Sequence, residues 1–126
     1  ALRWGTEHIY LVEDEEIVRE LAVKMLNSLG YRVSAFSDGE SAILGVMNGT
    51  GPIDLLLSDL VMPGMDGQTL ADALRQLQPT LKVLFTSGYS ESQGLEQGVR
   101  DGRIHFIAKP YSLQTLSAKL REVLGS

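Results

Sequence analysis

The stretch of sequence that most constrains the fold is an apolar run that stops abruptly at a carboxylate. Residues 53–57 read Ile-Asp-Leu-Leu-Leu, Ser58 and Asp59 follow, and residues 60–67 are rich in turn formers. A short apolar run bounded by turn signals is typical of a strand buried on both faces, as in parallel sheets. Ligands of open α/β sheets bind at the carboxyl ends of such strands, so Asp59 is either a helix cap or the centre of a functional site.

The same pattern recurs along the whole chain. Short apolar runs predict four further strands, over residues 8–12, 31–36, 81–85 and 104–108. Apolar residues at helical spacing predict helices between them, over residues 17–29, 37–47, 68–77, 90–100 and 112–123. Five strands alternating with five helices through short connections predict an α/β fold with a doubly wound parallel sheet. The flavodoxin-like strand order 2-1-3-4-5 is the common solution at this size.

Local signals refine the predicted helices. Ser37 and Glu40 have the spacing of a capping box, and Ser112 is the expected cap of the last helix. We interpret Asp66-Gly67 only as a turn. In the first helix, the residues expected to face the core are Ile17, Val18, Leu21, Ala22, Met25, Leu26 and Leu29. The inner face of the second is expected to hold Ala42, Ile43, Val46 and Met47.

Composition excludes several classes of protein. A chain of 126 residues with 44% hydrophobic content is long enough for one domain with a real core. There is no cysteine, and 11 basic against 16 acidic residues give a net charge of -5, which argues against binding to nucleic acid. No apolar run approaches the roughly 20 residues of a membrane span. We expect a cytoplasmic domain over residues 6–126 that makes no membrane contact itself, with residues 1–5 as a linker.

Six polar side chains come just after the predicted strands: Glu13, Asp14, Asp59, Thr86, Ser87 and Lys109. The carboxyl ends of parallel strands share one edge of the sheet, so these groups should converge. Three crowded carboxylates repel one another unless a cation joins them, and Mg²⁺ is the cation that such oxygen ligands favour. A lysine and a hydroxyl beside the cation would receive phosphoryl oxygens, and Asp59 would be the nucleophile that forms an acyl phosphate.

Each of these residues alone has another interpretation. Glu13 and Asp14 could simply favour a helix N-terminus, and Asp59 could be a loop residue. Thr86 could bond to local backbone, and Lys109 could be a surface lysine. Their joint placement at the ends of four strands favours the functional interpretation.

Four motifs resemble the receiver domain of two-component response regulators. They are Leu11-Val12-Glu13-Asp14-Glu15, the stretch Asp59-Leu60-Val61-Met62-Pro63-Gly64-Met65-Asp66-Gly67, Phe85-Thr86-Ser87-Gly88-Tyr89, and Phe106-Ile107-Ala108-Lys109-Pro110. The resemblance covers residues 6–124. Residues 5–7, together with residues 86–89, also resemble receivers attached to hybrid sensor histidine kinases.

The resemblance implies a role for each site residue. Asp59 would accept phosphate from a phosphohistidine on a histidine kinase or a histidine phosphotransfer protein. Mg²⁺ would be held by Glu13, Asp14, Asp59 and the backbone carbonyl of Val61. Lys109 would pair with Asp59 before transfer and with phosphoryl oxygens afterwards.

The resemblance also implies a switch. Thr86 would turn its hydroxyl towards the phosphate, and Phe106 would follow it inward. This would change the face made by the fourth predicted helix, the fifth strand and the last helix, and so control a partner, an attached kinase or a homodimer. The Lys109–Pro110 peptide bond is expected to be cis.

Two other functions compete with this one. Mg²⁺-dependent phosphatases that form an aspartyl phosphate are characterised by an Asp-x-Asp pattern. Here Val61 stands at the position of the second Asp, and the chain has no room for a cap domain. A degenerate receiver would act only as a binding module, yet all the expected side chains are present. We therefore expect a domain that catalyses only its own phosphorylation and dephosphorylation and is not otherwise an enzyme.

Val61 leads to a prediction about the lifetime of the phosphate. Its side chain has no polar group to position an attacking water, so we expect the variant Val61→Asn to lose its phosphate faster than the wild-type chain. The rate of dephosphorylation after removal of the phosphodonor measures this effect. An unchanged rate would contradict the interpretation of Val61.

Overall fold

The structure, a computed structural model, describes residues 2–49, 51–87 and 104–125. Its centre is a parallel five-stranded sheet in the order β2-β1-β3-β4-β5. The strands are β1 (His8–Val12), β2 (Arg32–Phe36), β3 (Leu55–Asp59), β4 (Lys82–Ser87) and β5 (Ile104–Ala108). The predicted α/β class and strand order are confirmed.

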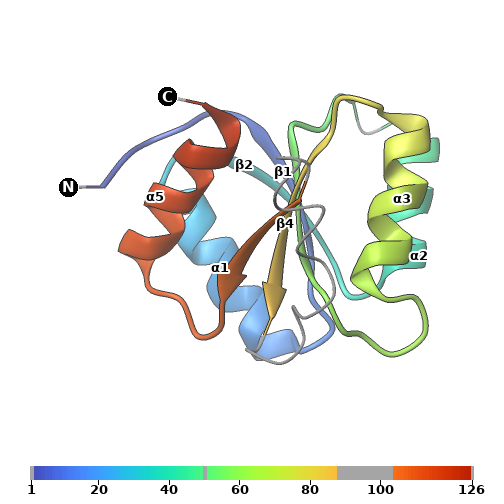
Figure 1. The fold of residues 1–126 in the computed structure, drawn as a ribbon, viewed down its shortest axis with the longest axis horizontal. Coiled ribbons are helices and arrows are strands. Elements are labelled where there is room, and N and C mark those ends of the chain that lie inside the picture. The colour runs from blue at the N-terminus through green and yellow to red at the C-terminus, as the bar shows by residue number, and fades with distance from the viewer. Residues whose placement is uncertain (1, 50, 88–103, 126) are drawn as a thin grey trace.

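Four helices cover the two faces of the sheet. They are α1 (Glu16–Ser28), α2 (Gly39–Met47), α3 (Gly67–Leu77) and α5 (Leu113–Leu124). Helices α1 and α5 lie on one face and α2 and α3 on the other (Figure 1). The helix predicted over residues 90–100 lies outside the described residues, so the prediction of five helices is confirmed only for these four. Within the described ranges no helix is both long and apolar enough to cross a membrane.

The core is divided into two layers by the sheet. Successive residues of a strand point to opposite faces. Leu55 and Leu57 therefore belong to the cluster under α1 and α5, whereas Leu56 belongs to the cluster under α2 and α3. All five residues of β3 are buried. Burial on both faces explains why this strand is a continuous apolar run and shows no alternation.

The starts of two helices differ from the prediction. The cap of α2 is Asp38, whose carboxylate accepts a hydrogen bond from the Ser41 amide at 2.8 Å, so the predicted capping box from Ser37 is wrong. This bond holds the pKa of Asp38 below its ordinary value. Asp66 is more than a turn residue, because it caps α3 by accepting the Thr69 amide at 2.8 Å. The predicted cap of α5, Ser112, is confirmed by its 3.0 Å bond from the Thr115 amide.

Helix α1 faces the core over a narrower stripe than predicted. Ala22 and Leu26 are buried as expected, but Ile17 is 80% exposed and Leu21 is 54% exposed. These two residues are four apart and lie on one side of the helix, away from the sheet. The prediction that they face the core is wrong, as it is for Met47 of α2, which is 68% exposed.

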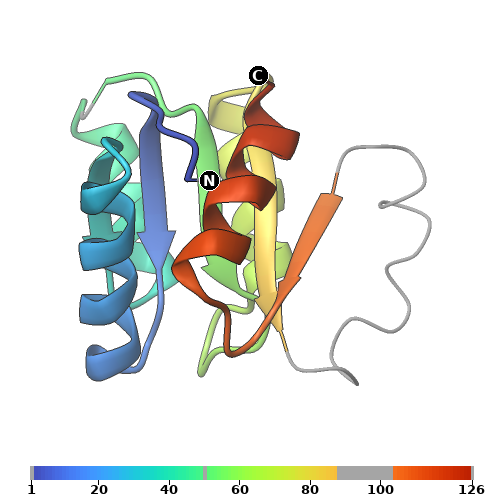
Figure 2. The same ribbon diagram turned by 90° about the vertical axis from the view of Figure 1, so that its left-hand side faces the viewer.

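The N-terminal segment lies against α5, close to the C-terminal end of the chain (Figure 2). The buried hydroxyl of Ser117 accepts a hydrogen bond from the Arg3 amide at 2.7 Å and donates one to the Arg3 carbonyl at 3.0 Å. The Gly5 amide donates to the Leu29 carbonyl at 3.0 Å. Backbone groups that precede β1 are therefore held by α5 and by the end of α1.

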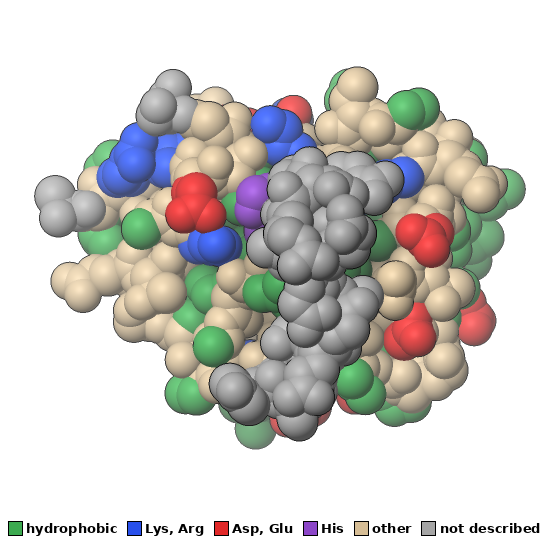
Figure 3. All heavy atoms as spheres, viewed as in Figure 1, with side chains coloured by type: hydrophobic (Ala, Val, Ile, Leu, Met, Phe, Trp, Pro, Cys, Tyr) green, Lys and Arg blue, Asp and Glu red, His purple; other side chains and the backbone are tan. Residues whose placement is uncertain are grey.

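Charged side chains are unevenly distributed over the surface. On the face shown in Figure 3, basic side chains lie mainly towards α5, and acidic side chains lie mainly towards α2 and α3. This face shows no continuous basic surface among the described residues, in keeping with the net charge of -5.

Candidate functional site

The carboxyl ends of the central strands bring the predicted site residues to one edge of the sheet. Asp59 is the register partner of Thr86 on the neighbouring strand, and Ser87 is the partner of Ala108. The ladder continues one residue beyond, because the Leu60 amide donates to the Thr86 carbonyl at 3.0 Å and the Lys109 amide donates to the Ser87 carbonyl at 3.2 Å. Backbone pairing therefore fixes the positions of Asp59, Thr86 and Lys109 relative to one another.

Three carboxylates meet at this edge. One oxygen from each of Glu13, Asp14 and Asp59 lies within 4.8 Å of the others. Glu13 and Asp59 are buried, with 3% and 7% exposure, whereas Asp14 is exposed. Buried carboxylates at this spacing are stable only with a compensating positive charge.

Lys109 supplies such a charge. Its ammonium nitrogen donates to Asp59 Oδ2 at 2.8 Å and to Glu13 Oε1 at 3.0 Å, and its side chain is 27% exposed. Partial burial acts to lower the pKa of Lys109, but the bonds to Asp59 and Glu13 outweigh it, and the pKa is raised. The ammonium is therefore held in its charged form between the two acids.

Glu13 is bound on both of its carboxylate oxygens. Its Oε2 accepts the Glu15 amide at 3.0 Å, while Oε1 accepts Lys109. Burial raises the pKa of Glu13, and these two bonds only partly oppose the effect. A divalent cation beside Glu13 would favour its ionised form, and the carboxylate oxygens are the hard ligands that Mg²⁺ prefers. The residues present therefore fit a divalent cation.

The other predicted site residues lie around this cluster. Thr86 is 4% exposed, beside Asp59 in the register, and Ser87 is buried one residue further along β4. Phe106 packs against Phe85 with ring centroids 5.8 Å apart. Val61 is 58% exposed in the loop after β3. The Lys109–Pro110 peptide bond is cis.

Gly67 packs against Asp59, the phosphoacceptor candidate. The sequence did not reveal this contact. The Gly67 amide donates to the Leu60 carbonyl at 2.8 Å. A Cβ atom at this position would lie 2.4 Å from the Asp59 carbonyl oxygen and 3.0 Å from the Leu60 Cα. Only glycine allows the first turn of α3 to approach the end of β3 this closely. The spacing from Asp66 to Thr69 could have indicated the helix start, but not this contact.

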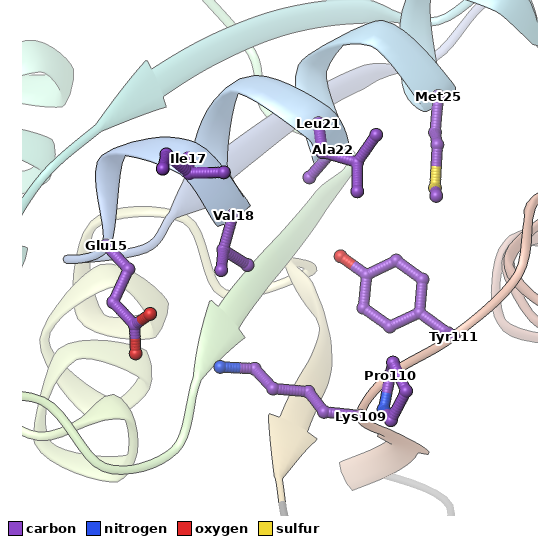
Figure 4. A pocket seen from close by; sticks show the side chains of 9 residues that line it. All are labelled: Glu15, Ile17, Val18, Leu21, Ala22, Met25, Lys109, Pro110 and Tyr111. Atoms are coloured by element: carbon purple, nitrogen blue, oxygen red, sulfur yellow. The ribbon is translucent and has the colours of Figure 1, made fainter.

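An apolar groove leads away from the acidic edge. It has a volume of about 390 Å³ and lies between α1 and the segment that follows β5. Its walls include Ile17 and Leu21 on one side and Lys109, Pro110 and Tyr111 on the other. In Figure 4 the Tyr111 hydroxyl points towards α1, and the Lys109 side chain extends towards the start of the same helix. Burial, followed by the charge of Glu13, raises the pKa of Tyr111, so its hydroxyl stays protonated.

Comparison with known proteins agrees with this geometry. The family model described as response regulator receiver domain matches residues 9–121. The sensor kinase CckA of Brucella abortus is 38% identical over 120 residues, which cover 95% of this chain but only 13% of the kinase. The response regulator receiver protein CpdR of the same organism is 33% identical, and the match covers 94% of this chain and 97% of that protein.

A solved structure shows the same fold. The crystal structure of a receiver domain from the hybrid histidine kinase CckA is 38% identical, with a TM-score of 0.76. The match covers 93% of this chain and 98% of that one.

The close approach of Gly67 generates a prediction. We expect Gly67→Ala to lower the free energy of unfolding by about 1–3 kcal/mol, the usual cost of overpacking, and to shift the amide signals of Asp59 and Leu60. Urea denaturation and two-dimensional NMR measure the two effects.

Gly64→Ala is the matched control for this prediction. Gly64 has a φ of +77° but nothing within 4 Å of its Cβ position, so its substitution adds backbone strain without a steric clash. We expect the Asp59 signal to stay in place in this control. Equal shifts at Asp59 in both variants would contradict the role given to Gly67.

Proposed function

The chain belongs to the response regulator receiver family, and from this premise we propose that Asp59 is its phosphoacceptor. The family serves phosphoacceptor signalling in two-component systems. The observation that carries the assignment of Asp59 is its ion pair with Lys109 at 2.8 Å, beside the buried Glu13 and next to Thr86 in the sheet register. An aspartate held in this way is largely shielded from bulk water and lies in direct contact with a compensating ammonium group.

The transfer follows from these positions. An oxygen of the Asp59 carboxylate attacks the phosphorus of a phosphohistidine, and the new O–P bond forms as the P–N bond breaks. The electron pair of the broken bond stays with the imidazole of the donor. Lys109 then transfers one of its hydrogen bonds from Asp59 to a phosphoryl oxygen, and the Thr86 hydroxyl donates another. Hydrogen bonds to oxygens that carry negative charge in the transition state are the main source of rate in such sites.

We propose that Mg²⁺ is the cofactor, held by Glu13, Asp14, Asp59 and the backbone carbonyl of Val61. The convergence of the three carboxylates within 4.8 Å supports the carboxylate part of this ligand set. When bound, the ion would neutralise negative charge on the phosphoryl group. The protein's own part is to hold Glu13 at both carboxylate oxygens, so that the acidic edge is already formed before the donor arrives.

The isolated domain is then a switch that acts on itself and not an enzyme with a separate substrate. Val61 stands where the aspartyl-phosphate phosphatases would need a second acid, which disfavours that alternative. A degenerate receiver that only binds partners is disfavoured because Glu13, Asp14, Asp59, Thr86 and Lys109 are all present at one edge of the sheet. We take residues 6–126 as the receiver unit, with the preceding residues held against α5.

The partner class follows from the chemistry of the donor. We propose a histidine kinase or a histidine phosphotransfer protein as donor and a hybrid sensor histidine kinase as the parent protein, which the 38% identity to CckA supports. A free-standing regulator is the alternative, because the chain is also 33% identical to the response regulator receiver protein CpdR. The transmitted change would run from Thr86 to Phe106 and on to the surface formed by β5 and α5, which would control the attached kinase or a homodimer. The helix expected beside this surface lies outside the described residues.

The groove beside α1 is the surface that best fits the donor. A donor protein must bring its phosphohistidine to Asp59, and the groove begins at Lys109, which contacts Asp59 directly. The exposed apolar side chains of Ile17 and Leu21 form its outer wall. Exposed apolar groups next to a reaction site are typical of a surface that a partner covers. We propose that an apolar helix face beside the donor histidine packs here.

The role of Asp59 is tested by substitution. We expect Asp59→Asn to abolish formation of a Mg²⁺-dependent acyl phosphate with acetyl phosphate as donor, because an amide is not a nucleophile for this reaction. Asp54→Asn is the control, since Asp54 is an exposed acid at the opposite end of β3. The acyl phosphate is measured by its lability to hydroxylamine. Its absence from the wild-type chain would favour the degenerate receiver instead.

The docking surface has a separate test. We expect Leu21→Asp to slow phosphotransfer from a phosphorylated histidine phosphotransfer protein by roughly 10-fold or more, because burying an unpaired charge at an interface is costly. Phosphorylation by acetyl phosphate, which needs no docking surface, should change much less. Leu44→Asp is the matched control, since Leu44 is 57% exposed on α2, away from the groove. Equal slowing in both variants would contradict the assignment.

A further inference from the structure

The connection between β1 and α1 carries two of the three site carboxylates, yet its helix starts without the usual cap. Residue Glu15 occupies the N-cap position of α1, and its side chain makes no capping hydrogen bond. Serine, threonine, aspartate and asparagine are the residues that normally hold a helix start. The conformation of this acidic turn must therefore depend on other contacts.

Arg19 provides one of these contacts. Its Nη1 donates to the backbone carbonyl of Glu13 at 2.8 Å, across six residues of sequence. The other contacts of Glu13 are made through other atoms: its amide donates to the Phe36 carbonyl at 3.1 Å, and its carboxylate accepts the Glu15 amide and Lys109. Arg19 is therefore the side chain that holds the carbonyl end of this residue.

The carbonyl of Glu13 belongs to the peptide group that leads into Asp14. Asp14 is exposed. Rotation of this peptide would change the direction in which the Asp14 carboxylate leaves the backbone. The hydrogen bond from Arg19 restricts that rotation. A charged donor on a carbonyl makes a stronger hydrogen bond than a neutral donor does.

We propose that Arg19 is a positioning residue for the cation site, which acts through the Glu13–Asp14 peptide and not on the cation itself. This inference rests on the proposed function, because it assumes the cation site of Glu13, Asp14 and Asp59. Residues that orient metal ligands from outside the coordination shell commonly change metal affinity by about 10- to 100-fold when they are substituted.

The charge of Arg19 predicts the opposite effect from its hydrogen bond. A guanidinium near a divalent cation repels it, so removal of the charge alone would tighten Mg²⁺ binding. Loss of the hydrogen bond from Arg19 to the Glu13 carbonyl would instead weaken Mg²⁺ binding. The direction of the change therefore separates a positioning residue from a nearby surface charge.

The experiment is a Mg²⁺ titration of the wild-type chain and two variants, without any phosphodonor, followed by the amide NMR signals of the acidic edge. Arg19→Met keeps most of the length of the side chain but removes every donor, and we expect its Mg²⁺ affinity to fall roughly 10-fold. Arg19→Lys keeps a charged donor of similar reach, and we expect it to stay within about 3-fold of the wild type. Hydrogen exchange at the Glu15 amide, measured without metal, should be faster in Arg19→Met than in Arg19→Lys.

Arg75→Met is the matched control. Arg75 also donates to a backbone carbonyl, that of Leu81 at 3.3 Å, but it lies on α3 and away from the acidic edge. We expect it to change the midpoint of urea denaturation without changing the Mg²⁺ affinity.

Three results would overturn the inference. Unchanged or tighter Mg²⁺ binding by Arg19→Met would show that Arg19 acts only as a charge, or not at all. An equal loss of Mg²⁺ affinity in Arg75→Met would show that reduced stability of the fold, and not the loss of a specific contact, weakens Mg²⁺ binding. If the wild-type chain itself bound no Mg²⁺, the proposed function would fail and this inference with it, a result distinct from the other two.

Discussion

The ion pairs of Lys109 with Asp59 and Glu13 are the interaction on which the rest of the site depends. Two buried carboxylates beside a third would repel one another, and in a low-dielectric environment at least one would take up a proton. The ammonium, 2.8 Å from Asp59 and 3.0 Å from Glu13, offsets this repulsion. Lys109 also lines the apolar groove, so one side chain contacts both the reacting aspartate and the surface proposed for the donor.

The parallel sheet makes this arrangement possible. Glu13, Asp59 and Lys109 are separated by tens of residues along the chain and meet only because β1, β3, β4 and β5 end at one edge. Pairing of Asp59 with Thr86, extended by the bond from the Leu60 amide to the Thr86 carbonyl, sets their distance through the backbone. The contact of Gly67 with Asp59 adds a constraint from α3. The positions of the reacting groups are thus set mainly by the strands and by α3, and less by the loops between these elements.

Some features could be predicted from the sequence because they depend on local patterns. The apolar run before Asp59, the helical spacing after residue 16 and the cap at Ser112 all follow from the neighbours of each residue in the chain. Features that depend on the direction of a helix could not be predicted in this way. Ile17 and Leu21 have the same apolar character as Ala22 and Leu26, and only the packing of α1 against the sheet distinguishes the exposed pair from the buried pair. Asp38 and Ser37 are both good caps, and the backbone conformation selects Asp38.

The sequence by itself determined the alternation of strands and helices, the polar residues at the strand ends and the resemblance of four motifs to receiver domains. These properties depend only on residue types and on their spacing along the chain, which are the same before and after folding. Only the tertiary structure decided which groups touch: Lys109 with both Asp59 and Glu13, Arg19 with the Glu13 carbonyl, and Gly67 with the end of β3. The physical reason is that hydrogen bonds and ion pairs act over about 3 Å. Distances of this size between remote residues are set by the packing of whole elements and leave no signal in local sequence.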